Sequence, residues 1–166
     1  MKIRNVKESE IAVTTDIIVR GWQTAYRGII ADDFLDNLDR GEITQRRLQD
    51  YKTTNYIVAI EDNTIVGVCR YIDNEDNDYI IDGVKSEIIA LYVEPNLKGN
   101  GIGSKIFEYV KDDLKRRHKN NMILWCLKDN TSARKFYEKH GGILVGEKTI
   151  TFGGQDYVEV GYQYKW

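Results

Sequence analysis

The sequence predicts an α/β (α+β) domain with a mixed, mostly antiparallel sheet of six to seven strands flanked by helices. Near residue 55 the hydrophobic periodicity changes from helical to strand-like. A strand–helix–strand unit at 86–93, 101–117 and 122–127 then predicts one parallel pair with a right-handed crossover. Short turns join the other strands, which we expect to be antiparallel. The 166 residues show no linker or repeat, and so predict a single domain over 1–166.

The N-terminal third is predicted to be mainly helical. A short strand at 3–6 precedes a helix that begins at Ser9, and shorter helices are expected at 32–38 and 42–51. Apolar and aromatic residues recur along one face of the first helix: Ile11, Ile18, Trp22 and Tyr26.

Two hairpins are expected in the remainder of the chain. Apolar, β-branched runs at 56–61 and 65–71 are joined by Asp62-Asn63-Thr64, and the runs 143–152 and 157–166 flank a Gly-Gly pair.

Two further segments lie between these hairpins. The acidic stretch 74–78 predicts a turn. Residues 130–140 predict a helix that Asn130 caps and Gly141 ends.

Composition excludes several classes of protein. A net charge of −2 and a pI near 5.8 disfavour nucleic-acid binding. The N-terminus lacks the apolar run of a signal peptide, and no stretch approaches the roughly 20 apolar residues of a membrane span. We therefore expect a cytoplasmic protein without a membrane partner. The aromatic C-terminal tail could finish the sheet or lie in a dimer contact, and a homodimer is the expectation.

The cysteines do not predict a metal site. Cys69 and Cys126 lie in apolar strand-like runs, without CxxC or Cys/His spacing. Reduced thiols in the core are expected, and one disulfide between them stays open as the alternative.

The most informative segment is a glycine-rich loop, KGNGIG at 98–103, between a strand and a helix. Backbone N–H groups at the start of a helix lack partners, and the helix dipole favours negative charge there. Such a loop predicts a phosphate cradle. The alternative is a simple turn leading into the helix.

Two other phosphate loops do not fit. A P-loop needs two glycines separated by four residues and followed by Lys and then Ser or Thr, and this spacing is absent. The dinucleotide fingerprint needs a third glycine where Ser104 or Ile106 stands, and no acidic residue follows at 119–123. A nucleotide-binding domain is thereby disfavoured.

The loop resembles motif A of the GNAT superfamily of acyl-CoA-dependent N-acetyltransferases, in which Gln or Arg precedes a Gly-x-Gly/Ala element. Lys98 replaces the usual Gln or Arg, and lysine offers a phosphate a point charge without arginine's fork. LYVEP (91–95) resembles the family's pantetheine-binding strand, and 124–142 resembles its motif B. TAYRGII (24–30) resembles a bacterial branch, so the likeness covers about residues 3–165.

The resemblance implies acetyl-CoA as the acyl donor and an amine as the acceptor, with no metal. It assigns coenzyme A binding to residues of the strand, the loop and motif B: Leu91, Tyr92, Val93, Lys98, Gly99, Asn100, Gly101, Gly103, Ser104 and Asn130.

Direct acyl transfer requires a base, an oxyanion site and an acid. Glu87 is the candidate base, because some family members carry a glutamate at this spacing; an exposed structural glutamate is the alternative. Tyr137 is the candidate acid for the thiolate, although it could simply pack. Unpaired N–H groups near Leu91–Val93, freed by a bulge or splay, would hold the oxyanion.

The acceptor side is harder to read. Trp22 and Tyr26 could wall an amine pocket, although aromatic residues at helical spacing more often form core. A small amine, a polyamine and a peptide amine all fit, and a non-catalytic acyl-CoA-binding module is the alternative from another class. Two acidic groups could attract a cation or simply be solvated: Asp32, Asp33, Asp36 and Asp39, and Asp73, Glu75, Asp76, Asp78 and Asp82.

Overall fold

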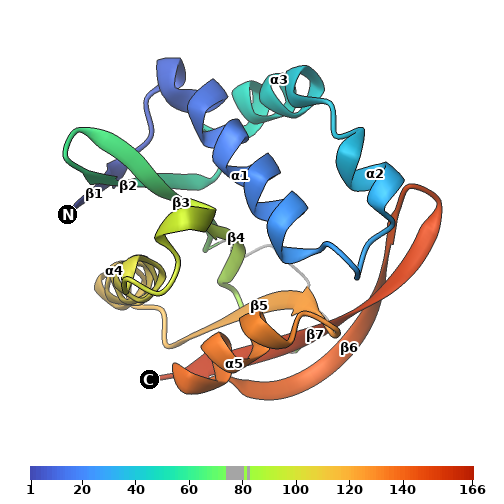
Figure 1. Ribbon diagram of the computed structural model, residues 1–166. Coiled ribbons are helices and arrows are strands. Elements are labelled where there is room, and N and C mark those ends of the chain that lie inside the picture. Colours follow the sequence, from blue (N-terminus) through green and yellow to red (C-terminus); the bar gives the residue numbers. More distant parts are fainter. Residues whose placement is uncertain (74–80, 82) are drawn as a thin grey trace.

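In the computed structural model, which describes residues 1–73, 81 and 83–166, a seven-stranded mixed sheet is flanked by helices (Figure 1). The strands are β1 (Lys2–Asn5), β2 (Asn55–Glu61), β3 (Thr64–Ile72), β4 (Glu87–Val93), β5 (Asn121–Leu127), β6 (Ile143–Phe152) and β7 (Gln155–Lys165). The helices are η1 (Glu8–Glu10), α1 (Ile11–Ala25), α2 (Asp32–Asp36), α3 (Arg40–Asp50), η2 (Pro95–Leu97), α4 (Ile102–Arg116) and α5 (Thr131–Lys139).

The sheet order is β1-β2-β3-β4-β5-β7-β6. Among the strands of the described residues, β4 and β5 alone run parallel, and every other neighbouring pair is antiparallel. The predicted fold class and the single parallel pair are therefore confirmed. The predicted acidic turn at 74–78 lies outside the described residues.

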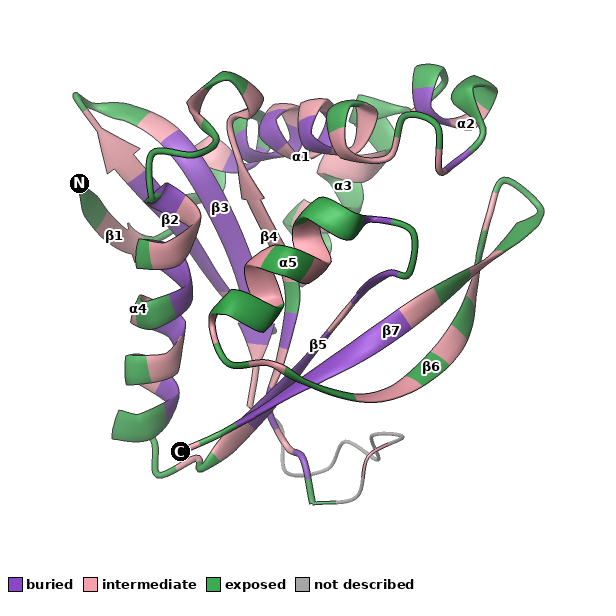
Figure 2. Cartoon of the chain, turned by 60° about the horizontal axis from the view of Figure 1, so that its bottom comes forward, coloured by how far each residue is buried: buried purple, intermediate pink, exposed green. Residues whose placement is uncertain are grey.

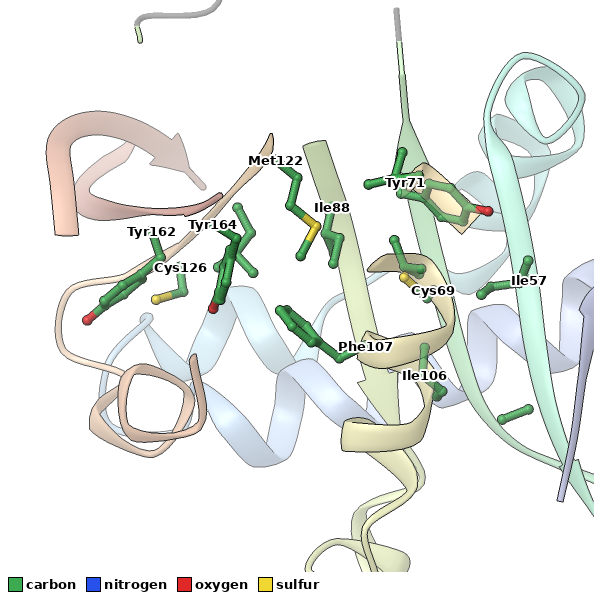
Figure 3. Packing of buried hydrophobic residues seen from close by; sticks show 14 of the residues in the cluster. Ile57, Cys69, Tyr71, Ile88, Ile106, Phe107, Met122, Cys126, Tyr162 and Tyr164 are labelled. Atoms are coloured by element: carbon green, nitrogen blue, oxygen red, sulfur yellow. The ribbon is translucent and has the colours of Figure 1, made fainter. Parts of the chain in front are cut away.

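The helices form two layers, one on each face of the sheet. Helices α4 and α5 cover one face, where Phe107, Ile88, Met122 and Tyr162 belong to the largest core cluster (Figure 3). Helices α1 and α2 cover the other face, and the tip of the β6–β7 hairpin reaches α2 (Figure 1). The two layers therefore bury most of β3 and β5, and β3 is largely purple in Figure 2, which explains the nearly continuous apolar runs of these two strands.

The two parallel strands separate soon after they pair. In the described register, β4 and β5 pair only at Glu87 with Ile123 and at Ile88 with Leu124. On its other side β4 pairs with β3, and there Ile89 is an extra residue that has no partner in the register. Beyond this β-bulge, β4 and β5 diverge as a V toward their C-terminal ends. The predicted splay is present, but the bulge lies at Ile89 rather than at 91–93.

Helix α1 packs against the C-terminal part of β4. Its Gly21 lies so close to Tyr92 that a Cβ there would be 2.7 Å from the Tyr92 ring. Arg20 donates two hydrogen bonds, of 2.9 and 2.8 Å, to the carboxylate of Glu94. These contacts hold the helix at the mouth of the V.

Both cysteines are buried, reduced thiols, as expected. Burial raises the pKa of Cys126 to about 12 and that of Cys69 further, so both stay protonated near neutral pH. Within the described residues, no helix is long and apolar enough to cross a membrane.

Candidate active site

A cleft of about 570 Å³ lies where β4 and β5 diverge, and α4, α5 and the end of α1 complete its walls. The predicted cofactor-binding residues line it, with the exception of Asn100: Leu91, Tyr92, Val93, Lys98, Gly99, Gly101, Gly103, Ser104 and Asn130. One end of the cleft is therefore the glycine loop, and the other is the base of the V.

The glycine loop has a backbone that only glycine adopts readily. Gly99 and Gly101 have φ angles of 89° and 77°, and a Cβ on either would project into open space. Gly103 is different: its φ is ordinary, and a Cβ would make van der Waals contact with Phe136 at 3.6 Å. Two of the three glycines are thus required by conformation.

The start of α4 offers hydrogen-bond donors to the cleft. Its first backbone bond runs from the Lys105 N–H to the Gly101 carbonyl at 3.0 Å. The amides that precede Lys105 in the first turn therefore have no helical acceptor, and the positive end of the helix dipole lies there. Together with Lys98, this is an arrangement that binds phosphate groups.

The β4 wall offers further backbone groups. Above Ile88, strand β4 pairs with β3 on one side but not with β5 on the other, in the described register. Alternate amides and carbonyls of Ile89–Val93 therefore face the cleft. An extended arm rich in amides could add here as a further strand, and an oxyanion could accept from the same groups.

Helix α5 forms the opposite wall. The Asn130 side-chain oxygen accepts from the Ala133 N–H at 3.1 Å, which fixes the start of the helix, and Asn130 is 9% exposed. One face of the helix then presents Ala133, Phe136 and Tyr137 to the cleft.

Tyr137 lines the cleft and carries a hydroxyl group with a raised pKa. Burial, assisted by the nearby Cys126, raises its pKa well above 10, so the hydroxyl stays protonated. Within the described residues, no hydrogen bond occupies this hydroxyl. It can therefore donate to an anion that forms in the cleft.

The two predicted acceptor residues have different positions. Tyr26 lines the cleft, and its hydroxyl lies 3.1 Å from that of Tyr92. Trp22 instead packs edge-on against Tyr26 and Phe152, with ring centroids 5.1 and 5.0 Å away, and is not among the lining residues. Trp22 therefore packs behind Tyr26 and stabilises its position without contacting the cleft itself.

Glu87 is the first residue of β4 and is half-buried. It does not line the cleft, whose wall begins at the next residue, Ile88. Because β-strand residues rise by roughly 3.3 Å each, Glu87 lies about 20 Å along the strand from Val93. The structure thus places it at the closed end of the V.

The predicted acidic groups have structural partners where they are described. Asp32 and Asp36 pair with Arg27 at 3.1 and 2.7 Å. Asp39 caps α3, and Asp73 pairs with Arg117 at 3.3 Å. The rest of the second group lies outside the described residues: Glu75, Asp76, Asp78 and Asp82.

Sequence reasoning missed several lining residues, among them Ile89 and Trp125 near the base of the V and the cation Lys139 of α5. Trp125 lies one position beyond the last parallel pair. Its place depends on where the strands separate, for which a single sequence carries no signal. Lys139 follows Phe136 by one helical turn, and this spacing could have indicated it.

The comparisons with known proteins agree with this geometry. Residues 22–142 match the sequence profile described as the acetyltransferase (GNAT) family. The chain is 24% identical over 161 residues to the uncharacterized N-acetyltransferase YuaI of Bacillus subtilis, covering 96% of this chain and 90% of that protein. It is 29% identical over 97 residues to the acetyltransferase PseH of Campylobacter jejuni, and this match covers 57% of this chain and 55% of PseH.

Two solved structures share the whole fold. The PaiA N-acetyltransferase of Thermoplasma acidophilum, in complex with coenzyme A, has a TM-score of 0.74 at 18% identity and covers 99% of this chain and 98% of its own. YncA of Salmonella typhimurium, described as a putative acetyltransferase with acetyl-CoA, has a TM-score of 0.71 at 20% identity and covers 99% and 93%. The profile match spans most of the domain, and the chain belongs to the GNAT acetyltransferase family.

Proposed function

We propose that this protein is an N-acetyltransferase that moves the acetyl group of acetyl-CoA directly to a primary amine. The observation that carries the proposal is the cleft itself. It combines a left-handed glycine loop at a helix start with an unpaired strand edge and a protonated tyrosine. The coenzyme A complexes of structural neighbours support the same donor.

The chain's own residues would hold the donor at three places. Lys98 and the amides at the start of α4 would bind the pyrophosphate. The free edge of β4 would pair with the pantetheine arm, as an added strand does. The thioester would then lie at the base of the V, beside Trp125 and Tyr137.

The reaction is one nucleophilic substitution at the thioester carbonyl. The amine nitrogen forms a bond to the carbonyl carbon, the carbon–sulfur bond breaks, and the amine loses one proton. Backbone N–H groups of β4 would stabilise the oxyanion, and Tyr137 would protonate the departing thiolate. A covalent route through Cys126 is disfavoured, because its raised pKa keeps the thiol protonated.

The proton from the amine would leave through water. We keep Glu87 as the candidate base, because it adjoins Ile88 at the closed end of the V and could receive the proton through a water chain. The cytoplasmic location and the homodimer stay predictions.

A two-step experiment tests the proposal. Acetyl-CoA is first titrated into the purified protein by calorimetry, and a panel of primary amines is then assayed for release of the coenzyme A thiol. Binding followed by thiol release with at least one amine supports the proposal. Binding without turnover across the panel would favour a non-catalytic acyl-CoA-binding module, and no binding to folded protein would exclude both.

A further inference from the structure

Beyond Trp125, a lysine, a carboxylate and an aromatic ring meet on the face of the sheet that α1 covers. Lys148 of β6 and Glu159 of β7 are direct cross-strand partners, with Lys148 Nζ 3.5 Å from Glu159 Oε2. The same Nζ lies 4.4 Å from the centre of the Trp125 ring. Trp125 is itself a wall of the cleft. An ammonium group is thus already bound beside the place where the thioester would lie.

The carboxylate of this cluster is sheltered from solvent. The Glu159 side chain is 14% exposed, compared with 48% for Glu147 on the neighbouring strand, which pairs with Lys128 at 2.7 Å. Glu159 pairs across the sheet with Leu127, which packs with Tyr26. Its charge also contributes to raising the pKa of the Tyr26 hydroxyl, after burial. Glu159 therefore lies near Tyr26 and Trp125, which line the cleft, although it is not itself a lining residue.

Trp125 is held in place by the backbone beneath it. Its ring lies over Gly161, where a Cβ would be 2.8 Å from the indole. The residue that pairs with Trp125 must therefore be small, and the ring presents its π-face to Lys148. A carboxylate and an aromatic face are the two features that bind alkylammonium groups.

We propose, on the basis of the acetyltransferase function, that Glu159 and Trp125 form a cation site for the acceptor. The Lys148 ammonium group is the internal occupant of this site: it fills the site when no acceptor is bound, and the cation of the acceptor replaces it. An ammonium paired with Glu159 keeps its proton and is not a nucleophile. The site therefore binds a second cationic group of the acceptor, while a different amine of the same molecule reaches the thioester. The acceptor class is then a diamine, or a peptide amine with a neighbouring basic side chain.

The direct test uses a probe that the enzyme cannot consume. The three tryptophan indole N–H signals are recorded by ¹H–¹⁵N NMR with unacetylated coenzyme A present, and Trp125→Phe assigns one of them. n-Butylammonium is then titrated, with n-butanol as the uncharged probe of matched size. We expect the Trp125 signal to move with butylammonium and not with butanol.

Three variants locate the effect. Glu159→Gln should weaken butylammonium binding about tenfold, because the carboxylate is lost from a sheltered site. Glu147→Gln is the matched control: it removes a carboxylate of the same hairpin, which pairs with Lys128 just after β5, and it should leave binding unchanged. Lys148→Met should strengthen binding several-fold, because the internal competitor is removed.

The outcomes separate this inference from the function on which it rests. If coenzyme A binds but butylammonium does not move Trp125, or binds equally well to Glu159→Gln, the cation site is overturned and the acetyltransferase proposal stands. If Lys148→Met abolishes butylammonium binding in a folded protein, the role of internal occupant is overturned. Failure of coenzyme A to bind would overturn the proposed function itself.

A kinetic comparison tests the substrate class. 1,4-Diaminobutane should be acetylated with a kcat/KM at least about tenfold above that of n-butylamine in the wild type and in Glu147→Gln. Glu159→Gln should lose that preference, mainly through KM. Equal kcat/KM for the two amines in the wild type would contradict a second cation site.

Discussion

The two walls of the cleft to which we assign the acyl donor and the acceptor are built from different chemical groups. The donor wall, formed by β4, η2 and the start of α4, offers mainly backbone groups: left-handed glycines, free helix amides and an unpaired strand edge. The proposed acceptor wall offers side chains: Tyr26 and Trp125 line the cleft, and Lys148 and Glu159 lie beside Trp125. A backbone site depends on the fold and a few glycines, whereas a side-chain site can change with single substitutions. Coenzyme A recognition should therefore be robust, and acceptor choice easily altered.

The largest effect is expected from a charge in the glycine loop. Gly101→Glu should weaken acetyl-CoA binding at least about a hundredfold, because it puts bulk and like charge where the pyrophosphate would lie. Gly154→Glu is the control: Gly154 also has a left-handed φ, of 78°, with open space around it, but it lies in the β6–β7 turn. Calorimetry should show loss of acetyl-CoA binding for Gly101→Glu only. Equal loss of binding in both variants would contradict the assignment of the phosphate cradle to the glycine loop.

The next effect tests Tyr137, which we propose as the acid that protonates the departing thiolate. Tyr137→Phe should lower kcat about a hundredfold with any accepted amine, while the Kd for acetyl-CoA stays unchanged. The control is Tyr162→Phe, whose ring is 6.1 Å from that of Tyr137 but whose hydroxyl pairs with Glu138 outside the cleft. An unchanged kcat in Tyr137→Phe would show that the hydroxyl has no catalytic role and that the Tyr137 ring only packs.

A smaller effect, on stability, is expected where α1 packs against β4 and Tyr26 meets Tyr92. Gly21→Ala places a Cβ 2.7 Å from the Tyr92 ring and so disturbs the Tyr26–Tyr92 hydroxyl pair. We expect the free energy of unfolding to fall by about 1–3 kcal/mol in urea titrations. Gly103→Ala, whose Cβ meets Phe136 at an ordinary 3.6 Å, should be tolerated. Equal stability of the two variants would show that α1 can move away from β4 without cost.

The smallest effect concerns the edge of the sheet furthest from the acceptor wall. Arg4 donates to Glu10 at 2.8 and 2.7 Å and lowers the pKa of that carboxyl from 4.5 to about 2. A lowered folded pKa stabilises the protein above pH 4.5, and this stabilisation is lost as the pH falls toward 2.

Glu10→Gln should therefore cost about 1 kcal/mol at pH 7, after allowance for solvent screening, and progressively less below pH 4.5. Urea unfolding across this pH range measures the difference. Asp16→Asn, which removes a more exposed partner of Arg40, should cost nothing measurable. A pH-independent difference for Glu10→Gln would assign its effect to packing.

The same contrast explains what could be predicted from sequence. The donor wall is local: the glycine loop, its strand and its helix are consecutive, so spacing and turn chemistry predicted them, together with the parallel pair. The acceptor wall gathers residues more than a hundred positions apart. Trp125 of β5 and Lys148 of β6 meet across β7 because β7 lies between their strands, an order that no local pattern encodes.

Individual assignments follow the same logic. Trp22 and Tyr26 share a helical face, but the turn after α1 leaves only Tyr26 at the cleft, so periodicity could not separate them. Spacing along the chain predicts Glu87 as the base. The bulge at Ile89 and the divergence of β4 from β5 decide which strand residues reach the cleft, and both arise from sheet packing.

The most direct test of the two-walled account is to map coenzyme A on the backbone amides by ¹H–¹⁵N NMR. We predict large shifts at Gly101–Ser104 and along Ile89–Val93, and little change in the amides of β6 and β7 that carry Lys148 and Glu159. Shifts concentrated on β6 and β7, with the glycine loop unaffected, would contradict the assignment of the donor to the backbone wall.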